Sequence, residues 1–477
     1  MQPVNDTIAA IATAPGAAGI AIIRISGAEA FAIADRVFRC NPPMPSERPA
    51  LQIVYGHIVR DGKDLDEALL LPFRAPASYT REDIVELHVH GGSISARAAL
   101  QAVLAQGARP AGPGEFTRRA FLSGRIDLLQ AEAVMDLISA KSQRAATAAV
   151  EQLEGNLSRA FHAIYDTLIT VAADLEAQLD FDEDELPARA TEDLLLRLAR
   201  ARTELEALIS TWEEGHRLRE GTLVVLAGRP NAGKSTLLNL LLGKERAIVT
   251  PIAGTTRDSL EEEVVLQGFP LRIVDTAGLR TADCEIEQEG IRRSRGLMEK
   301  AEIVILLIDA SRPLDAEDHA LLDNCPHDNT LVLLNKVDLG QIITPADIPQ
   351  NHVVSCSLLQ RHDQPFVVPP SGGPPQEQAD TQIPGIDACK QALCEMLHLS
   401  TQTESHAVIS ERHRITAQHT LSTILQAMQT LQAHGESSEM IAALALRDGI
   451  EQLGQITGSS YHDNLLEAIF SRFCVGK

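Results

Sequence analysis

The sequence predicts a multidomain protein that combines α/β domains with an all-α domain. Its 477 residues are enough for about three domains. The chain begins with β-rich runs punctuated by Gly and Pro and continues with long Ala/Leu/Glu-rich helical stretches. It then alternates short apolar strands with helical segments before helical texture returns. The expected fold class is therefore multidomain α/β plus all-α: an N-terminal α+β domain, a discontinuous helical domain, and a P-loop domain inserted into the helical domain.

Each domain boundary is placed where the texture changes. The N-terminal domain is expected at 1–118, the helical domain at 119–219 and 399–477, and the inserted domain at 220–398. Within the inserted domain, residues 358–385 are rich in Pro, Gly and polar residues, which predicts a disordered insertion because such a composition cannot bury a core. Since the chain ends of a P-loop domain lie near one another, the two helical parts can pack together as one domain.

Local patterns support the elements of the first two domains. The runs "IAIIRISG", "LQIVYGHIV" and "DIVELHVHGG" have the β-rich composition of strands. Asp61 and Gly62 stand between two apolar runs, as the central pair of a hairpin turn does. From Ile126 to Leu137 apolar residues recur at helical spacing, which predicts an amphipathic helix.

Composition and charge limit the classes of partner and location. The formal net charge of −23 repels nucleic acid at long range, so RNA contact would need a partner protein or a local patch such as Arg118, Arg119 and Arg125. The expected location is cytoplasmic, without a membrane, because the sequence shows neither a charged-then-apolar leader nor an apolar run of ~18 residues. Seven cysteines without regular spacing predict reduced thiols.

The strongest chemical signal lies at the start of the inserted domain. In "TLVVLAGRPNAGKSTLLNLLLG" a β-run is followed by Gly228, four residues, Gly-Lys-Ser at 233–235, and then a helical run. This is the spacing of a P-loop, in which backbone N–H groups surround the phosphates, Lys234 neutralises β- and γ-phosphate oxygens, and Ser235 binds Mg²⁺. The segment therefore predicts a Mg²⁺-dependent nucleotide site.

Two later loops predict that the nucleotide is GTP or GDP. "LRIVDTAGL" ends a strand at Asp275, where a carboxylate can join the Mg²⁺ shell, and Gly278 can bring a backbone N–H to the γ-phosphate. "LVLLNKVDL" ends another strand, and the Asp338 carboxylate can accept two hydrogen bonds that guanine supplies and adenine does not. Thr256 in "AGTTRD" is the expected switch threonine, which binds Mg²⁺ only beside the γ-phosphate. The predicted GTP-binding residues are Asn231, Ala232, Gly233, Lys234, Ser235, Thr236, Thr250, Thr255, Thr256, Asp275, Thr276, Ala277, Gly278, Asn335, Lys336 and Asp338.

The attacking water must be positioned differently from that of Ras-like enzymes. Where those enzymes carry a water-orienting glutamine after the Asp-Thr-Ala-Gly segment, this sequence has Leu279, which cannot form a hydrogen bond through its side chain. The side-chain oxygen of Asn231 could bind a monovalent cation that neutralises charge at the phosphates, or it could cap the loop. The residues alone leave both roles open.

Motifs outside the P-loop extend the pattern over nearly the whole chain. They are "YTREDIVELHVHGG", "PGEFTRRAFLSGRIDLLQAEA", "IAGTTRD", "DTAGLR" and the terminal "FCVGK". With "GRPNAGKSTLLN" they resemble the TrmE/MnmE family of tRNA-modification GTPases. The nucleotide-binding motifs alone would also suit ribosome-assembly GTPases, whereas the N-terminal motifs and the tail are specific to this family. The resemblance implies a folate-binding N-terminal domain and an inserted Ras-like G domain.

For the G domain, the resemblance implies a K⁺-dependent GTPase that is activated when two G domains meet. The implied K⁺ ligands are Asn231, Thr250, Ile252 and Thr255, and the implied Mg²⁺ ligands are Ser235 and Thr256. Glu287 falls where the family carries an acidic residue that orients the attacking water through a bridging water, so a catalytic role is implied. Without the resemblance, Glu287 would be interpreted as a solvated glutamate.

For the N-terminal domain, the resemblance implies a homodimer with a folate site. The implied folate-binding residues are Arg24, Glu86, Arg125 and Lys477. A carboxylate suits the paired donors of a pterin ring, and cations suit the glutamate tail of 5,10-methylene- or 5-formyl-tetrahydrofolate. The family works with the flavin-dependent GidA/MnmG partner, in a heterotetramer or larger complex. Together they form 5-carboxymethylaminomethyl-type groups on the wobble uridine of certain tRNAs.

Cys474 in "FCVGK" has three interpretations. A lipid anchor is disfavoured because Gly476 and Lys477 do not fit a prenylation box. The thiol could be a small apolar plug beside Phe470 and Phe473. Since the resemblance places Lys477 at the folate, the tail would bring Cys474 to the one-carbon unit, and a catalytic role is expected.

The loop at Ser355–Ser357 departs from the family pattern. The sequence Ser-Cys-Ser replaces the usual Ser-Ala-x loop beside guanine, which leaves the guanine contacts of this loop open. Two other functions compete with a folate-dependent tRNA-modification GTPase: a ribosome-assembly or regulatory GTPase switch, and a lipid-anchored switch protein. Binding of a folate by the N-terminal domain would separate the first function from the other two.

Overall fold

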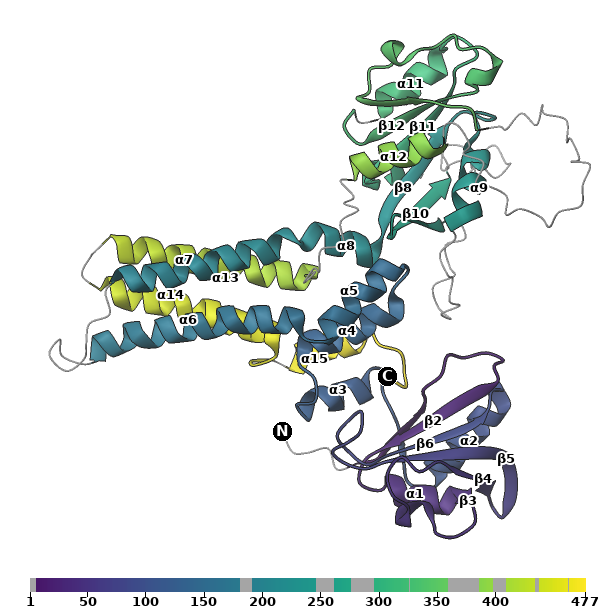
Figure 1. Ribbon diagram of the computed structural model, residues 1–477, viewed down its shortest axis with the longest axis vertical. Helices are drawn as coiled ribbons and strands as arrows, with labels where there is room; N and C mark the ends of the chain where they lie inside the picture. The colour runs from purple at the N-terminus through teal and green to yellow at the C-terminus, as the bar shows by residue number, and fades with distance from the viewer. Residues whose placement is uncertain are drawn as a thin grey trace, which may run out of the picture. The chain divides into compact units, whose positions relative to one another are not determined.

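The computed structural model describes residues 6–180, 191–245, 261–275, 296–325, 327–358, 386–397, 409–433, 437–461 and 463–477. The chain divides into two compact units, whose elements are labelled in Figure 1. The first unit comprises Met1–Ile138, Ala148–Trp212 and Ala407–Lys477, and the second comprises Ser139–Thr147 and Glu213–His406. Among the described residues, no helix has the length and apolar character needed to cross a membrane.

A seven-stranded sheet forms the N-terminal part of the first unit, in the order β3-β4-β5-β6-β2-β1-β7. Its strands are β1 (Ile8–Ile11), β2 (Ile20–Ser26), β3 (Phe38–Arg39), β4 (Val54–Arg60), β5 (Lys63–Phe73), β6 (Ile84–His90) and β7 (Arg109–Pro110). The turn between β4 and β5 is the predicted Asp61-Gly62 hairpin, with φ values of 51° and 74°. Positive φ at both central residues matches the twist of the flanking strands.

Helices α1 (Ala30–Val37) and α2 (Ser93–Ala105) cover one face of this sheet. Alternate strand residues such as Ile23, Leu70 and Leu87 face these helices and are fully buried, because successive side chains of a strand point to opposite faces. Each such side chain contributes about 1.5–3 kcal/mol relative to exposure. The opposite face carries Arg24 and Glu86, so the strand alternation that builds the core also presents the predicted folate residues.

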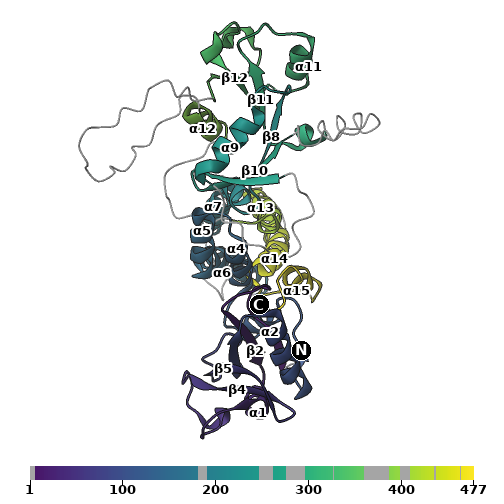
Figure 2. The ribbon, with the colours of Figure 1, turned by 90° about the vertical axis from the view of Figure 1, so that its right-hand side faces the viewer.

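The helical part of the first unit contains long antiparallel helices. Its elements are α3 (Glu115–Leu122), α4 (Leu128–Ser139), α6 (Asn156–Asp180), α7 (Thr191–Ser210), α13 (Glu411–Gln432), α14 (Ser438–Thr457) and α15 (Asp463–Phe470). Helix α5 (Gln143–Leu153) begins in the second unit and ends in the first. Figures 1 and 2 show α6, α7, α13 and α14 side by side. Leu168 and Leu205, before the inserted domain, share one core with Ile424 and Leu446, after it. The prediction of a single helical domain interrupted by an inserted domain is confirmed.

A buried ion cluster joins the two halves of the helical domain. Glu132 on α4 accepts hydrogen bonds from Arg412 Nε at 2.9 Å and Arg412 Nη2 at 3.0 Å, and it lies 2.6 Å from His413 Nε2. Burial opposes the charged carboxylate, but the Arg412 and His413 side chains outweigh it and hold the pKa of Glu132 far below its ordinary value. The cluster therefore fixes the start of α13 against α4.

The second unit is built on a six-stranded sheet in the order β13-β12-β11-β8-β10-β9. Its strands are β8 (Thr222–Gly228), β9 (Glu261–Leu266), β10 (Phe269–Asp275), β11 (Ile303–Asp309), β12 (Thr330–Asn335) and β13 (His352–Ser355). Its helices are α8 (Trp212–Glu220), α9 (Lys234–Glu245), α11 (Ala316–Asn324) and α12 (Ile386–Met396). All strand pairs are parallel except β9 with β10. The predicted α/β sheet is confirmed, and the ends of β8, β10 and β12 meet at one edge.

Leu358 belongs to the core of this unit. The composition predicts that Leu358 begins the insertion, whereas its side chain is 3% exposed and packs with Ala232 and Leu333. The remaining residues of the predicted insertion, 359–385, lie outside the described residues. An apolar side chain at the end of a polar stretch can complete a core that the local composition does not reveal.

Candidate functional site

The P-loop between β8 and α9 has a backbone that requires its glycines. Gly228 has φ of +139° and Gly233 has φ of +113°, which L side chains rarely adopt. A Cβ at Gly228 would lie 2.5 Å from Leu307 O, and one at Gly233 would lie 2.4 Å from Asn335 Nδ2. The loop therefore packs directly against the neighbouring strands, with Asn231 at φ of +64° on its exposed side.

The Lys234 side chain is buried within this loop and binds its backbone. Its Nζ donates to Gly228 O at 2.7 Å and to Arg229 O at 2.8 Å, and the residue is only 6% exposed. The first turn of α9 follows at once and brings Ser235 and Thr236, together with the positive end of a helix, to the same place. A buried cation and helix N–H groups at one loop form a site for the phosphates of a nucleotide.

Asn335 connects the P-loop with the segment after β13 through hydrogen bonds to the backbone of both. It ends β12 and is 4% exposed, and its Nδ2 donates to Ala232 O at 2.8 Å. Its Oδ1 accepts from Leu358 N at 3.1 Å. Sequence reasoning placed Asn335 among the nucleotide contacts, and in the structure both ends of its amide bind backbone. It holds two nucleotide loops in register, a role visible only in three dimensions.

Asp338 and Lys336 extend from the loop after β12. Ser357 Oγ donates a hydrogen bond to Asp338 Oδ1 at 2.7 Å. The unusual Ser-Cys-Ser segment therefore contacts the carboxylate that is predicted to bind guanine. Lys336 adopts φ of +66° and reaches Asp309 at 2.7 Å. Burial raises the pKa of Asp309, but hydrogen bonds from Lys336 and Ser311 outweigh burial and hold this pKa below its ordinary value.

Sequence reasoning missed Asp309. The available signal was its position at the carboxyl end of β11, where the parallel register pairs it with Asn335. Asp275 ends β10 next to Leu226 of β8, at the same edge of the sheet. The other predicted residues of this site lie outside the described residues: Thr250, Ile252, Thr255, Thr256, Thr276, Ala277, Gly278 and Glu287.

A second group of polar residues lies on the open face of the N-terminal sheet. Arg24 and Glu86 are direct neighbours on β2 and β6, and Arg24 Nε donates to Glu86 Oε1 at 2.8 Å. The Arg24 guanidinium lies 5.6 Å from the centroid of the Tyr79 ring, and that of Arg125 lies 4.7 Å from it. Tyr79 therefore connects two of the predicted folate residues, although no sequence pattern singles it out.

The C-terminal tail is pinned to the same domain. Phe116 N donates to Lys477 O at 3.1 Å, and the Phe116 ring lies 5.6 Å from the Arg24 guanidinium. A Cβ at Gly476 would lie 2.3 Å from Ile11 O, so only glycine allows this close approach. Contacts thus run from Lys477 through Phe116 to Arg24, and from there through Tyr79 to Arg125.

Cys474 is exposed in this tail. The interpretation of its thiol as an apolar plug is wrong, because Phe470 and Phe473 bury their own rings against each other at 5.5 Å and leave Cys474 outside. Cys474 O accepts from Gly114 N at 3.4 Å, which fixes the backbone beside the thiol. The other described cysteines are also free thiols, as the sequence predicted.

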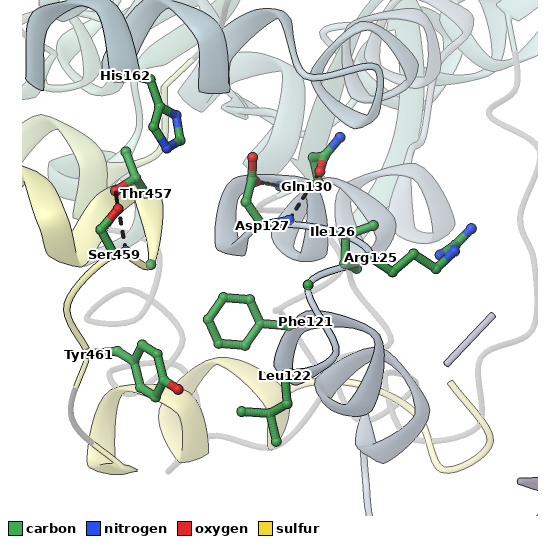
Figure 3. Close-up of a pocket in the computed structure, with 12 residues that line it drawn as sticks. Phe121, Leu122, Arg125, Ile126, Asp127, Gln130, His162, Thr457, Ser459 and Tyr461 are labelled. Carbon is green, nitrogen blue, oxygen red and sulfur yellow. Dashed lines mark hydrogen bonds between the residues drawn. The ribbon is translucent and has the colours of Figure 1, made fainter. Parts of the chain in front are cut away.

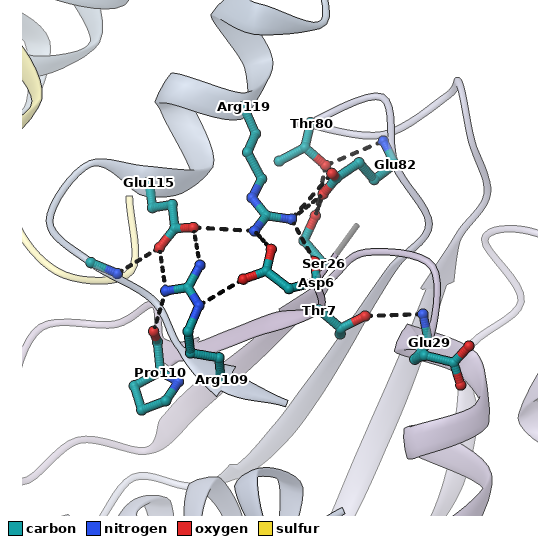
Figure 4. A network of polar contacts seen from close by, with 11 residues as sticks. Asp6, Thr7, Ser26, Glu29, Thr80, Glu82, Arg109, Pro110, Glu115 and Arg119 are labelled. Atoms are coloured by element: carbon teal, nitrogen blue, oxygen red, sulfur yellow. Dashed lines mark hydrogen bonds and ion pairs between the residues drawn. The ribbon is translucent and has the colours of Figure 1, made fainter. Parts of the chain in front are cut away.

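Arg119 is not available for a nucleic-acid patch. Figure 4 shows its guanidinium among the carboxylates of Asp6, Glu82 and Glu115, at 2.7, 3.1 and 3.1 Å, and the residue is 7% exposed. The prediction that Arg119 joins Arg118 and Arg125 in a patch for RNA is therefore wrong for this residue. A buried, fully engaged arginine instead fixes α3 to the sheet.

A separate cavity of about 480 Å³ lies in the first unit between the α3–α4 connection, α6 and the end of α14. Figure 3 shows His162, Thr457 and Tyr461 along its wall. Phe121 and Tyr461 meet edge to face at 5.3 Å. Arg125 also lines this cavity, and its guanidinium lies 4.7 Å from the Tyr79 ring centroid, so Arg125 borders both the cavity and the Arg24–Glu86 group.

A parallel sheet with a P-loop after β8 and an Asn-Lys-x-Asp loop after β12 defines a P-loop GTPase, which hydrolyses GTP. The family model described as "GTP-binding protein TrmE N-terminus" matches residues 7–125, and that described as "MnmE helical domain" matches residues 128–474. Three curated proteins called "tRNA modification GTPase MnmE" are similar to this chain over 99% of its length. That of Natranaerobius thermophilus is 38% identical with 100% of its own chain covered, that of Syntrophotalea carbinolica 39% with 99%, and that of Chloroflexus aurantiacus 40% with 100%. The chain belongs to the MnmE family of tRNA modification GTPases.

Proposed function

We propose that this chain is a K⁺-dependent GTPase of tRNA modification that uses a folate one-carbon donor. It hydrolyses GTP to GDP in the G domain. In the cytoplasm, with a flavin-dependent GidA/MnmG partner in a heterotetramer or larger complex, it forms 5-carboxymethylaminomethyl-type groups on the wobble uridine of certain tRNAs. The observation that carries the proposal is a chain of contacts in a protein that also has a complete P-loop. Glu86 pairs with Arg24, Arg24 and Arg125 both lie over the Tyr79 ring, and the Lys477 backbone binds Phe116 next to Arg24.

The residues around Tyr79 have the chemistry that a tetrahydrofolate needs. The Glu86 side chain is 14% exposed, with Arg24 Nε 2.8 Å from its Oε1 and His88 Nε2 3.4 Å from its Oε2. Each oxygen has a second lone pair that can accept one of the paired N–H donors of a pterin ring. The aromatic ring of Tyr79 can support a flat ligand, and Arg125 and Lys477 can pair with carboxylates of the glutamate tail. A bound 5,10-methylene- or 5-formyl-tetrahydrofolate would supply the one-carbon unit. Cys474, exposed on the same tail, is proposed as a catalytic thiol.

In the G domain, each proposed metal ligand has a defined task. Ser235 and Thr256 hold Mg²⁺, and Asn231 offers its side-chain oxygen from the exposed side of the P-loop to K⁺. The remaining proposed K⁺ ligands are Thr250, Ile252 and Thr255. A cation held there would neutralise charge that develops on the phosphates, the task of an arginine finger in other GTPases. Glu287 is proposed to orient the attacking water.

An exposed apolar strip on the N-terminal sheet supports a homodimer. Tyr55, Leu69 and Ile20 lie on the face opposite α1 and α2 and are 61%, 39% and 56% exposed. Large exposed apolar side chains on one sheet face favour burial against a second copy. With a net charge of −23, the protein would leave most tRNA phosphate contacts to its partner.

Titration of the full chain with 5-formyltetrahydrofolate tests the proposal. We expect saturable binding that Glu86→Gln weakens by about tenfold or more, since a charge-assisted hydrogen bond is lost. The matched control is Arg60→Gln, which removes an exposed arginine at the carboxyl end of β4. This variant should bind 5-formyltetrahydrofolate as the wild type does. An absence of folate binding, combined with specific ribosomal RNA binding, would instead favour a ribosome-assembly GTPase.

A further inference from the structure

A short segment of the helical region belongs to the nucleotide-binding unit. Residues Ser139–Thr147 group with Glu213–His406, while Ala148–Trp212 belong to the first unit. Helix α5 (Gln143–Leu153) therefore begins in one unit and ends in the other. We call Ser139–Thr147 the coupling segment. Because one continuous helix has its first residues in one unit and its last residues in the other, a movement of its first turn can be passed to the other unit.

The coupling segment contacts the β9–β10 hairpin at two places. Lys141 Nζ lies 2.5 Å from Glu263 Oε1 on β9. The Arg144 guanidinium lies 4.5 Å from the centroid of the Phe269 ring at the start of β10, a cation–π contact. At the turn, Gly268 has φ of +85°, and a Cβ there would lie 3.0 Å from the Arg144 Cβ. A side chain at this position would be strained by the positive φ and would press against Arg144.

Arg144 also reaches the element that leads into the P-loop. Its guanidinium pairs with Glu214 on α8, and α8 is followed directly by β8. The Arg144 side chain is 18% exposed, so most of it is enclosed by these partners. One arginine thus contacts both the hairpin turn and the helix before the nucleotide loop.

The β9–β10 hairpin is adjacent in sequence to two predicted nucleotide-binding segments. Its turn end pairs Phe269 with Leu266, and its far end pairs Val274 with Glu261. The far end connects in sequence to the segment that carries Thr256 and, after Asp275, to the segment that carries Gly278. Both segments are predicted to contact the γ-phosphate. The pairing of β9 with β10 is unbroken between these two ends, so a shift of the hairpin at its far end can reach the turn that Arg144 contacts.

We propose that the coupling segment transmits the nucleotide state of the hairpin to the helical domain through α5. Lys141 and Arg144 are positioning residues that act on the hairpin and do not touch nucleotide. The proposal rests on GTP binding and not on the folate or tRNA chemistry proposed above, so its failure would leave that chemistry intact.

Hydrogen–deuterium exchange of the full-length protein tests the proposal. Exchange is measured with Mg²⁺ and K⁺ in two states, GDP and GDP with aluminium fluoride. We expect peptides covering 139–153 to exchange differently in the two states. In Arg144→Gln this difference should shrink by about threefold or more, while the difference at the P-loop peptides persists. Identical exchange of 139–153 in both states, or an unchanged difference in Arg144→Gln, would overturn the proposal.

A charge reversal keeps the test decisive if Arg144→Gln unfolds. Lys141→Glu should reduce the nucleotide-dependent difference at 139–153, and the double variant Lys141→Glu/Glu263→Lys should restore it. Arg200→Gln removes an exposed ion pair on α7 and serves as the control, with wild-type exchange expected. A double variant no closer to wild type than Lys141→Glu would show that the Lys141–Glu263 contact does not carry the coupling.

Discussion

The Glu132 cluster allows a quantitative test of how the divided helical domain is held together. In Glu132→Gln the carboxylate that pairs with Arg412 and His413 becomes a neutral amide, and two cationic or hydrogen-bonding side chains lose their partner. Breaking a buried ion pair from one side costs about 3–5 kcal/mol. Since Glu132 and Arg412 side chains are 18% and 24% exposed, water can solvate part of the remaining charge, and we expect about 3 kcal/mol.

Tryptophan fluorescence can follow this domain, because Trp212 at the start of α8 packs against the helical core. The protein has one tryptophan, Trp212, and the Arg414 guanidinium of α13 lies 4.4 Å from its ring centroid. We expect the fluorescence-detected Tm to fall by about 5–10 °C in Glu132→Gln. Glu204→Gln, whose partner Arg200 is 82% exposed, is the control and should change stability by less than about 1 kcal/mol. A Tm shift in Glu132→Gln no larger than that of the control would refute the reasoning.

The same cluster predicts a pH dependence with a defined sign. The pKa of Glu132 is depressed in the folded protein, so its contribution to stability is present above the ordinary value of 4.5. This contribution is lost as the pH falls below 4.5 toward the folded pKa, because the unfolded state then binds the proton first. Wild type should therefore lose helical-domain stability over this range more steeply than Glu132→Gln. Equal slopes would contradict the assignment.

Three further predictions concern the nucleotide site and the tail. Hydrolysis of GTP should be at least about tenfold faster in K⁺ than in Na⁺, and Asn231→Ala should remove the difference; equal rates in both salts for the wild type would exclude the cation role. Asn335→Ala should weaken GDP binding by about ten- to a hundredfold in a fluorescent-nucleotide titration, because Ala232 O and Leu358 N lose buried partners. Cys474→Ser should leave GTP hydrolysis and folate affinity nearly unchanged and severely reduce tRNA modification; normal modified-uridine levels in cells with only this variant would remove the thiol from the mechanism.

Local patterns in the sequence were sufficient for much of the fold. The Asp61-Gly62 turn, the apolar stripe of α4 and the strand–P-loop–helix order each depend on neighbours close in the chain, and all three are present in the structure. The division of the helical domain followed from the geometry of P-loop domains. The motifs also led to the family, because they are short and contiguous.

The tertiary structure alone decided which side chains meet across long stretches of chain. Glu132 and His413 are 281 positions apart, and no local pattern marks them as partners. Arg119 has the same sequence character as the exposed Arg125, yet carboxylates from distant segments enclose it. Tyr79 gains its place only because Arg24 and Arg125 converge on it. The energy of an ion pair or a packed ring depends on its surroundings in space, and the sequence specifies those surroundings only through the complete fold.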